Sequence, residues 1–169
     1  MLAPARSPGD ALLKEFRAAL VATTAAAYSV EAMYGDFKYL IEPQRDKDAR
    51  YQTLMRAFRA AFGLSGDAEE RLRRDLRWLF ERRDEAVHPY TESETPAQHP
   101  AGFNTGVEHQ SFNAVESGRA VDTALTVLDI AATPSTTSPR WIRRWASLRS
   151  GHHDTVRPLR DERNRQPLP

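Results

Sequence analysis

The sequence contains no cysteine among its 169 residues. Disulfide bonds and thiolate metal sites are therefore excluded, and these are the usual supports of small secreted domains. The N-terminal residues form no apolar run of signal-peptide length, and no later stretch approaches the roughly 20 apolar residues that a membrane span needs. These absences predict an intracellular protein of the cytoplasm with no segment in the membrane.

Several catalytic motifs are also missing. The sequence has no Gly-x-Ser-x-Gly elbow, no His-Glu-x-x-His pair and no Gly-rich phosphate loop, so serine hydrolases, zincins and nucleotide triphosphatases lack their minimal parts. Of the five histidines, His152 and His153 are adjacent in a polar, Gly-flanked segment, which favours a solvated pair over a metal site. We therefore expect neither a metal nor a cofactor.

Composition and charge favour one folded domain with a charged surface. Apolar residues make up 40% of the chain and charged residues 28%, which is typical of a globular protein. From Arg140 onward, eight arginines stand against three acidic residues, so the end of the chain is basic and the rest is acidic. A basic arm can bind nucleic acid through phosphate contacts. The excess of 21 arginines over 3 lysines also fits a coding bias.

Apolar residues recur at steps of three and four through most of the chain, which is the period of an amphipathic helix. The first stripe includes Phe16, Thr23, Val30 and Phe37. The predicted helices cover about residues 10–41, 46–62, 68–87 and 113–132. A short fifth helix follows, for which Ser138 and Pro139 are predicted to form an N-cap and N1 pair. The expected fold is an all-α, up-and-down helical bundle.

Local signals set the expected helix ends. Asp10 is a candidate N-cap, Asp67 with Glu70 has the spacing of a capping box, and Gly63 is a natural stop after the second helix. Residues 91–108 show no period and predict a functional loop. We expect a bundle over residues 1–133, followed in residues 134–169 by the short helix and a basic tail that is disordered from Gly151.

The third helix carries a charge on its apolar stripe. Arg83 stands four residues after Leu79 and four before Val87, on the face that should be buried. Pro89 ends the helix, which places His88 in its last turn. The short fifth helix carries Trp141 and Trp145 four residues apart, and this spacing predicts that it packs onto the bundle.

The run from Leu79 to Tyr90 resembles the signature of the HEPN superfamily. These are helical-bundle proteins whose ribonuclease members carry an arginine, four to six intervening residues and a histidine, and Arg83 and His88 match with four. Many members have an asparagine after the arginine, where this chain has Asp84. Tyr90 extends the match to Arg-x4-His-x-Tyr, the form of HEPN toxins whose minimal nucleotidyltransferase antitoxin adds AMP to that tyrosine.

The resemblance covers most of residues 10–133 and implies a function. It implies a homodimer in which Arg83 and His88 of both chains face a shared cleft, and metal-independent endonucleolytic cleavage of RNA by its own 2′-hydroxyl. It further implies a toxin or defence role and a minimal nucleotidyltransferase antitoxin as partner. Asp84 joins Arg83 and His88 as a candidate catalytic residue, and Tyr90 is a candidate AMP-modification site.

The side-chain chemistry fits this reaction. Cleavage needs a group that moves protons near neutral pH, which suits His88. It also needs a cation that stabilises charge developing on the phosphate, which suits the planar donor fork of Arg83. Neither role needs a metal. Glu85, His99 and His109 are supporting candidates.

Each residue also has a structural interpretation. Arg83 can instead bridge an acidic residue of a neighbouring helix, with its stem along apolar surface. His88 can simply cap the helix C-terminus, and Tyr90 can be a half-buried aromatic. Asp84 either orients His88 or pairs with Arg83.

Two other functions remain open. The first is a non-catalytic HEPN module that binds a nucleotide or protein partner, with Trp141 and Trp145 as docking anchors. The second is a purely structural bundle.

Overall fold

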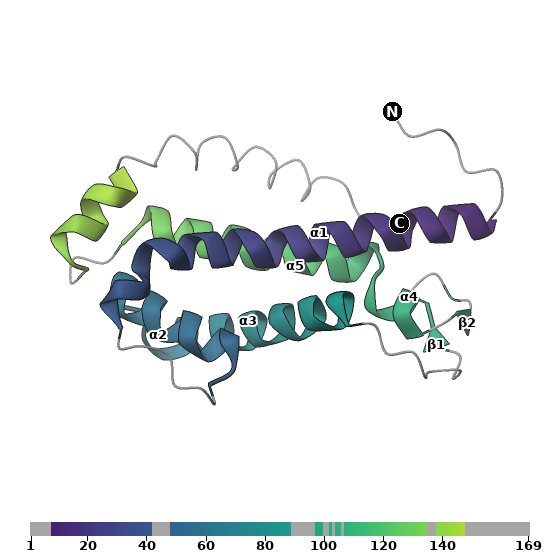
Figure 1. Ribbon diagram of the computed structural model, residues 1–169, viewed down its shortest axis with the longest axis horizontal. Coiled ribbons are helices and arrows are strands. Elements are labelled where there is room, and N and C mark those ends of the chain that lie inside the picture. Colours follow the sequence, from purple (N-terminus) through teal and green to yellow (C-terminus); the bar gives the residue numbers. More distant parts are fainter. Residues whose placement is uncertain are drawn as a thin grey trace.

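In the computed structural model, the described residues are 8–41, 48–88, 97–99, 102, 104–105, 107–134 and 138–147. They form α1 (Pro8–Phe37), a 3-10 turn η1 (Lys38–Leu40), α2 (Arg50–Phe62), α3 (Gly66–Val87), strands β1 (Ala97–Gln98) and β2 (Asn104–Thr105), α4 (Val107–Ser111) and α5 (Ala114–Ala132). Residues 140–147 are also helical. The predicted all-α bundle is confirmed (Figure 1).

The long helices lie side by side in two layers. α1 and α5 run along each other in one layer, and α2 and α3 form the other (Figure 1). α3 runs opposite to α1, so its C-terminal end lies toward the N-terminal half of α1. Arg82 near that end donates to Ser111 Oγ at 3.0 Å, and the nearby Ala114 N–H donates to Glu15 Oε1 at 2.9 Å. The end of α3 is therefore held beside α4, and the start of α5 is joined to α1.

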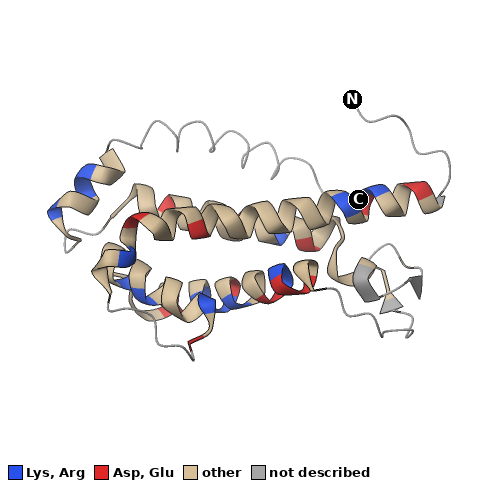
Figure 2. Ribbon diagram, in the orientation of Figure 1, with Lys and Arg blue, Asp and Glu red and all other residues tan. Residues whose placement is uncertain are grey.

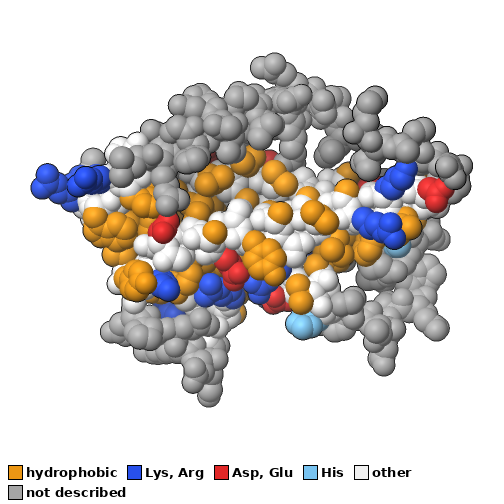
Figure 3. Space-filling view, turned by 45° about the horizontal axis from the view of Figure 1, so that its top comes forward, with side chains coloured by type: hydrophobic (Ala, Val, Ile, Leu, Met, Phe, Trp, Pro, Cys, Tyr) orange, Lys and Arg blue, Asp and Glu red, His pale blue; other side chains and the backbone are white. Residues whose placement is uncertain are grey.

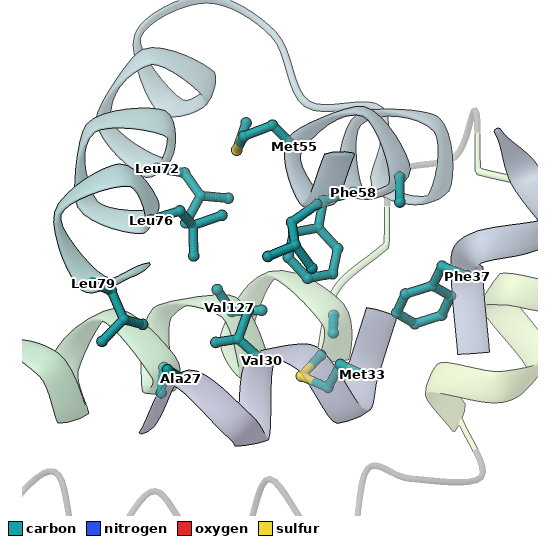
Figure 4. Packing of buried hydrophobic residues seen from close by; sticks show 14 of the residues in the cluster. Ala27, Val30, Met33, Phe37, Met55, Phe58, Leu72, Leu76, Leu79 and Val127 are labelled. Carbon is teal, nitrogen blue, oxygen red and sulfur yellow. The ribbon is translucent and has the colours of Figure 1, made fainter. Parts of the chain in front are cut away.

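The core lies between these layers and uses the apolar stripes that the sequence shows. Figure 4 shows Leu76 and Leu79 of α3 and Phe58 of α2 pointing toward Val30 of α1 and Val127 of α5. None of these five side chains is more than 1% exposed. The middle parts of the α1 and α3 stripes are thus buried as predicted, because a helix with one apolar face must cover it against a neighbour. The prediction is wrong at two outer ends, since Leu13 is 42% exposed and Val87 is 52% exposed.

Residues 140–147 pack onto the bundle through aromatic side chains, as predicted. The Trp145 ring meets the Phe37 ring edge-on with centroids 4.9 Å apart, and its Nε1 donates to Asp36 Oδ2 at 3.1 Å. Ile142 is fully buried in the core. Trp141 is 44% exposed. Residues 148–169, including the predicted tail, lie outside the described residues.

The predicted N-caps of α1 and α3 are wrong. α1 begins at Pro8, so Asp10 lies in its first turn, and α3 begins at Gly66 after Ser65, so Asp67 lies inside the helix. A proline at the first helical position suits α1, because that position has no intrahelical partner for an N–H. The Asp67 capping box fails because Gly66 adopts a positive φ of 62°, which lets the chain turn into the helix two residues earlier than predicted.

Other predicted ends shift by a few residues. α1 stops at Phe37 and its last turn tightens into the 3-10 geometry of η1, instead of continuing to residue 41. α2 begins at Arg50, and the expected start at residue 46 lies outside the described residues. Gly63 does end α2, with a φ of 68° that favours glycine.

The loop and the last helix also differ from expectation. Within residues 91–108 a two-residue antiparallel ladder pairs Ala97 with Thr105, and α4 begins at Val107. These elements are too short for their apolar residues to repeat, so the sequence shows no periodic signal for them. Ser138 does not cap the last helix among the described residues, since its buried Oγ has no hydrogen-bond partner and the helix begins only after Pro139.

Asn113 caps α5, and its replacement gives a first testable prediction. Its Oδ1 accepts from the N–H groups of Val115 and Glu116 at 2.9 and 3.0 Å, and the residue is 1% exposed. We expect Asn113→Ala to lower the free energy of unfolding by about 0.5–2 kcal/mol, because two N–H groups lose their acceptor. Asn113→Ser keeps an acceptor oxygen and should retain more of the stability than Asn113→Ala, although both variants lose the bond that Asn113 Nδ2 donates to the Gln110 carbonyl. Urea unfolding of both variants measures this, and equal losses would contradict the capping role.

No helix among the described residues is both long enough and apolar enough to cross a membrane.

Candidate functional site

The C-terminal end of α3 carries the residues that the sequence singles out. His88 is the C-cap residue, and its backbone N–H donates to the carbonyl of Asp84 at 2.9 Å. Its imidazole is exposed and makes no hydrogen bond, ion pair or ring contact with any other described residue. The ring is therefore accessible to a ligand approaching from solvent.

Arg83 is held firmly one turn earlier on the same helix. Its Nη1 donates to Glu31 Oε1 of α1 at 2.9 Å, and its Nε and Nη2 donate to Asp84 Oδ1 at 3.0 and 2.6 Å. The guanidinium lies over the Phe80 ring, 4.8 Å from its centroid, and the side chain is only 18% exposed. Arg83 thus bridges an acidic residue of a neighbouring helix, and its charge on the apolar stripe is paired.

The same geometry decides between the two interpretations of Asp84. Its carboxylate pairs with Arg83, and only its backbone carbonyl meets His88. Arg83 and His88 lie at the same end of α3, but no bond joins them. Five residues of helix turn about 140° and rise about 7.5 Å, so these two side chains leave the helix in different directions.

Glu31 is a site residue that sequence reasoning missed. Its Oε1 accepts from Arg83 and also from Arg50 Nε at 2.9 Å, and the Arg50 guanidinium lies 4.5 Å from the centroid of the Tyr34 ring. One carboxylate therefore connects α1, α2 and α3. The available signal was that Glu31 is the first charged residue after the uncharged run 18–30, so it needed a partner.

The electrostatics of this cluster keep Arg83 charged. Partial burial disfavours the charged guanidinium, but the hydrogen bonds and charges of Asp84 and Glu31 outweigh it, so the pKa of Arg83 is raised above its usual value. A guanidinium has five N–H donors. The three bonds to Asp84 and Glu31 leave two N–H groups that make no bond to the described residues. Those two can still meet a phosphate.

The supporting candidates interact with other residues. Glu85 pairs with Arg82. His99 is 4% exposed, with its Nε2 3.7 Å from Glu15 Oε2, and the His109 ring lies 4.9 Å from the Phe16 ring. Both histidines thus lie against neighbouring residues of α1. No contact joins either to Arg83 among the described residues.

Two further observations concern the predicted modification site and metal binding. Tyr90, the predicted modification site, lies outside the described residues. No group of three His, Asp or Glu residues in the described part of the chain is placed to hold a metal ion.

No family model, no curated protein and no solved structure matches this chain.

Proposed function

We propose that this protein is a metal-independent endoribonuclease of the HEPN type that acts as a homodimer in a toxin or defence role. The observation that carries the proposal is the end of α3. There a partly buried arginine, held on two sides by Glu31 and Asp84, lies five residues before a histidine whose ring is exposed. A fixed cation and an accessible proton carrier are the parts that the reaction needs.

The reaction forms one bond and breaks another at the same phosphorus. The RNA 2′-oxygen attacks the adjacent phosphorus, and the bond to the 5′-oxygen of the next nucleotide breaks. One imidazole accepts the 2′-hydroxyl proton and a second donates a proton to the leaving oxygen, which two copies of His88 would supply. The free N–H groups of Arg83 would bind the phosphate oxygens as charge develops on them. The products are a 2′,3′-cyclic phosphate and a 5′-hydroxyl end.

Cleavage of RNA by the purified chain is the direct test of the proposed activity and a second testable prediction. The purified chain should cleave single-stranded RNA in buffer that contains excess chelator, and the new ends should be cyclic phosphate and 5′-hydroxyl. Chelator should not change the rate, because both proposed catalytic groups are side chains. End analysis by mass spectrometry measures the products. An intact RNA, a 5′-phosphate product or loss of cleavage with chelator would each overturn the proposal.

A non-catalytic module is the second candidate, and one observation favours it. Three N–H groups of Arg83 are committed to Glu31 and Asp84, as in an ordinary structural ion pair. Such a module would bind a nucleotide or a protein partner, and the exposed Trp141 is available as a docking anchor.

A minimal nucleotidyltransferase antitoxin is the partner proposed with the toxin role. Incubation of such an enzyme and ATP with the chain should add one AMP, and Tyr90→Phe should prevent the addition.

A further inference from the structure

α1 has a second apolar face that the bundle does not cover. Between Arg17 and Glu31 the helix carries no charge (Figure 2). Its exposed residues recur at alternating steps of three and four, and we call them the outer stripe: Ala18, Val21, Ala25, Tyr28, Ala32 and Gly35. Val21 is 65% exposed and Tyr28 56%. Figure 3 shows small hydrophobic side chains along the middle of one face, with charged groups mainly toward its ends and lower edge.

This spacing is the one that two helices need to pack along their whole length. Steps of three and four give a repeat of seven, which keeps one seam facing a partner helix. The core stripe through Thr23, Val30 and Phe37 lies on the opposite side of the helix. The outer stripe thus has the spacing of a helix-pairing seam. Its small residues allow a partner helix to approach closely.

We propose that the outer stripe pairs with the same stripe of a second copy of this chain, with the two α1 helices antiparallel and centred near Thr23. This register overlaps nearly all of the 30-residue helix. It places Tyr28 opposite Ala18 of the second copy and Val21 opposite Ala25. A large side chain therefore meets a small one at each of these positions, as interdigitated packing requires.

Charges beside the seam select the antiparallel direction. In the proposed register, Asp10 faces Lys38 of the second copy and Arg17 faces Glu31, so opposite charges meet along this flank of the stripe. A parallel pair would instead place Asp10 beside Glu15 and Glu31 beside Asp36. Like charges would then meet on both sides.

The C-terminal segment of the same chain fits this face poorly. Residues 148–169 include eight charged residues of which five are arginines, with few apolar side chains. The uncharged outer stripe offers no acidic side chain for these arginines, whereas a second copy supplies an identical apolar stripe.

Pairing in this register would complete the candidate site. Arg17 and Glu31 lie on the same flank of the outer stripe. The two-fold axis therefore puts both copies of Glu31, each with its bound Arg83, on one side of the dimer. Arg17 of the second copy would stand beside the ion pair of Glu31 with Arg83, adding a cation to the cleft. From Arg83, α3 continues toward the level of the two-fold axis, so the two His88 residues would be separated less along α1 than the two Arg83 residues are. The proposed interface is inferred from α1 alone, whereas its role in catalysis rests on the proposed function.

Cysteine crosslinking tests the register, because the natural chain has no cysteine. In the proposed dimer Thr24 lies opposite its own copy, whereas Ala32 lies about 27 Å along the helix from its copy. We expect a short bis-maleimide to crosslink Thr24→Cys into a covalent dimer. Ala32→Cys should remain largely uncrosslinked, because its two cysteines lie too far apart in the same dimer. Efficient crosslinking of Ala32→Cys would show a parallel pair and overturn the register.

Sedimentation of the full chain tests the face. We expect Ala25→Glu to weaken dimerisation at least about 100-fold, because each dimer would bury two unpaired carboxylates. Ala60→Glu, at an exposed position of α2, is the matched control and should leave the dimer unchanged. A wild-type monomer, or a dimer that survives Ala25→Glu, would overturn the proposal.

A charge exchange tests the direction independently. We expect Asp10→Lys to weaken the dimer about threefold to thirtyfold, because it would face Lys38 of the second copy, and the added change Lys38→Asp to restore it. A parallel pair predicts tighter association for Asp10→Lys. If the wild type dimerises in this way but cleaves no RNA, the interface stands and the proposed function fails.

Discussion

Replacing His88 by alanine is expected to lower RNA cleavage by about 10² to 10⁴-fold while the fold and the dimer remain intact. Loss of a general acid or base costs this much in rate. Stability should change little, because the imidazole is exposed and makes no contact with other described residues. The helix end keeps its cap, since the bond from residue 88 to Asp84 is made by the backbone.

A second substitution separates proton transfer from hydrogen bonding. His88→Gln keeps donors and an acceptor near the position of the ring, but it moves no proton near neutral pH. We expect it to be as inactive as His88→Ala. Single-turnover cleavage of a defined RNA, with melting temperature and sedimentation measured on the same samples, gives all three quantities. Activity within threefold of wild type for either variant would exclude His88 from catalysis.

Replacing Arg83 by lysine is expected to lower cleavage by about 10² to 10³-fold, the usual cost of removing one positioned donor from a developing negative charge. Lysine keeps the positive charge and can reach Glu31, but it lacks the planar fork that holds Asp84 and a phosphate together. Activity is therefore expected to fall much more than stability. The measurement is the single-turnover rate beside the free energy of unfolding.

Arg50 provides the matched control for Arg83. Both guanidinium groups donate to the same atom, Glu31 Oε1, at 2.9 Å, and both stack on an aromatic ring. If Arg83 only joins α3 to α1, Arg50→Lys and Arg83→Lys should behave alike. If Arg83 binds the reacting phosphate, only Arg83→Lys should lose cleavage. Equal activity in the two variants would favour the non-catalytic module.

Much of the fold could be read from the sequence because its signals are local. The leucines of α3 recur at helical spacing, and Leu72, Leu76 and Leu79 are all buried. Gly63 and Asn113 act within a few residues of their own positions, so the end of α2 and the start of α5 were predictable. The two N-caps failed where Pro8 and Gly66 offered an earlier start.

The candidate site could likewise be predicted from the sequence only in part. The sequence alone placed Arg83 on a buried stripe and His88 at a helix end, because helix spacing and Pro89 determine both. It left open whether Asp84 serves His88 or Arg83, since side-chain pairing depends on rotamers and neighbours that spacing does not specify. It also gave no reason to join Glu31 to Arg83, which lie 52 residues apart in the chain.

α1 shows most clearly what each level decides. The sequence by itself determined a long helix whose stripe through Thr23, Val30 and Phe37 is apolar, because hydrophobic period is a local property. Only the tertiary structure decided that α5, α2 and α3 all pack on one side of that helix, leaving Val21 and Tyr28 uncovered. Burial depends on how many neighbours can surround a helix, and in this chain the three that pack on α1 do not reach its outer stripe.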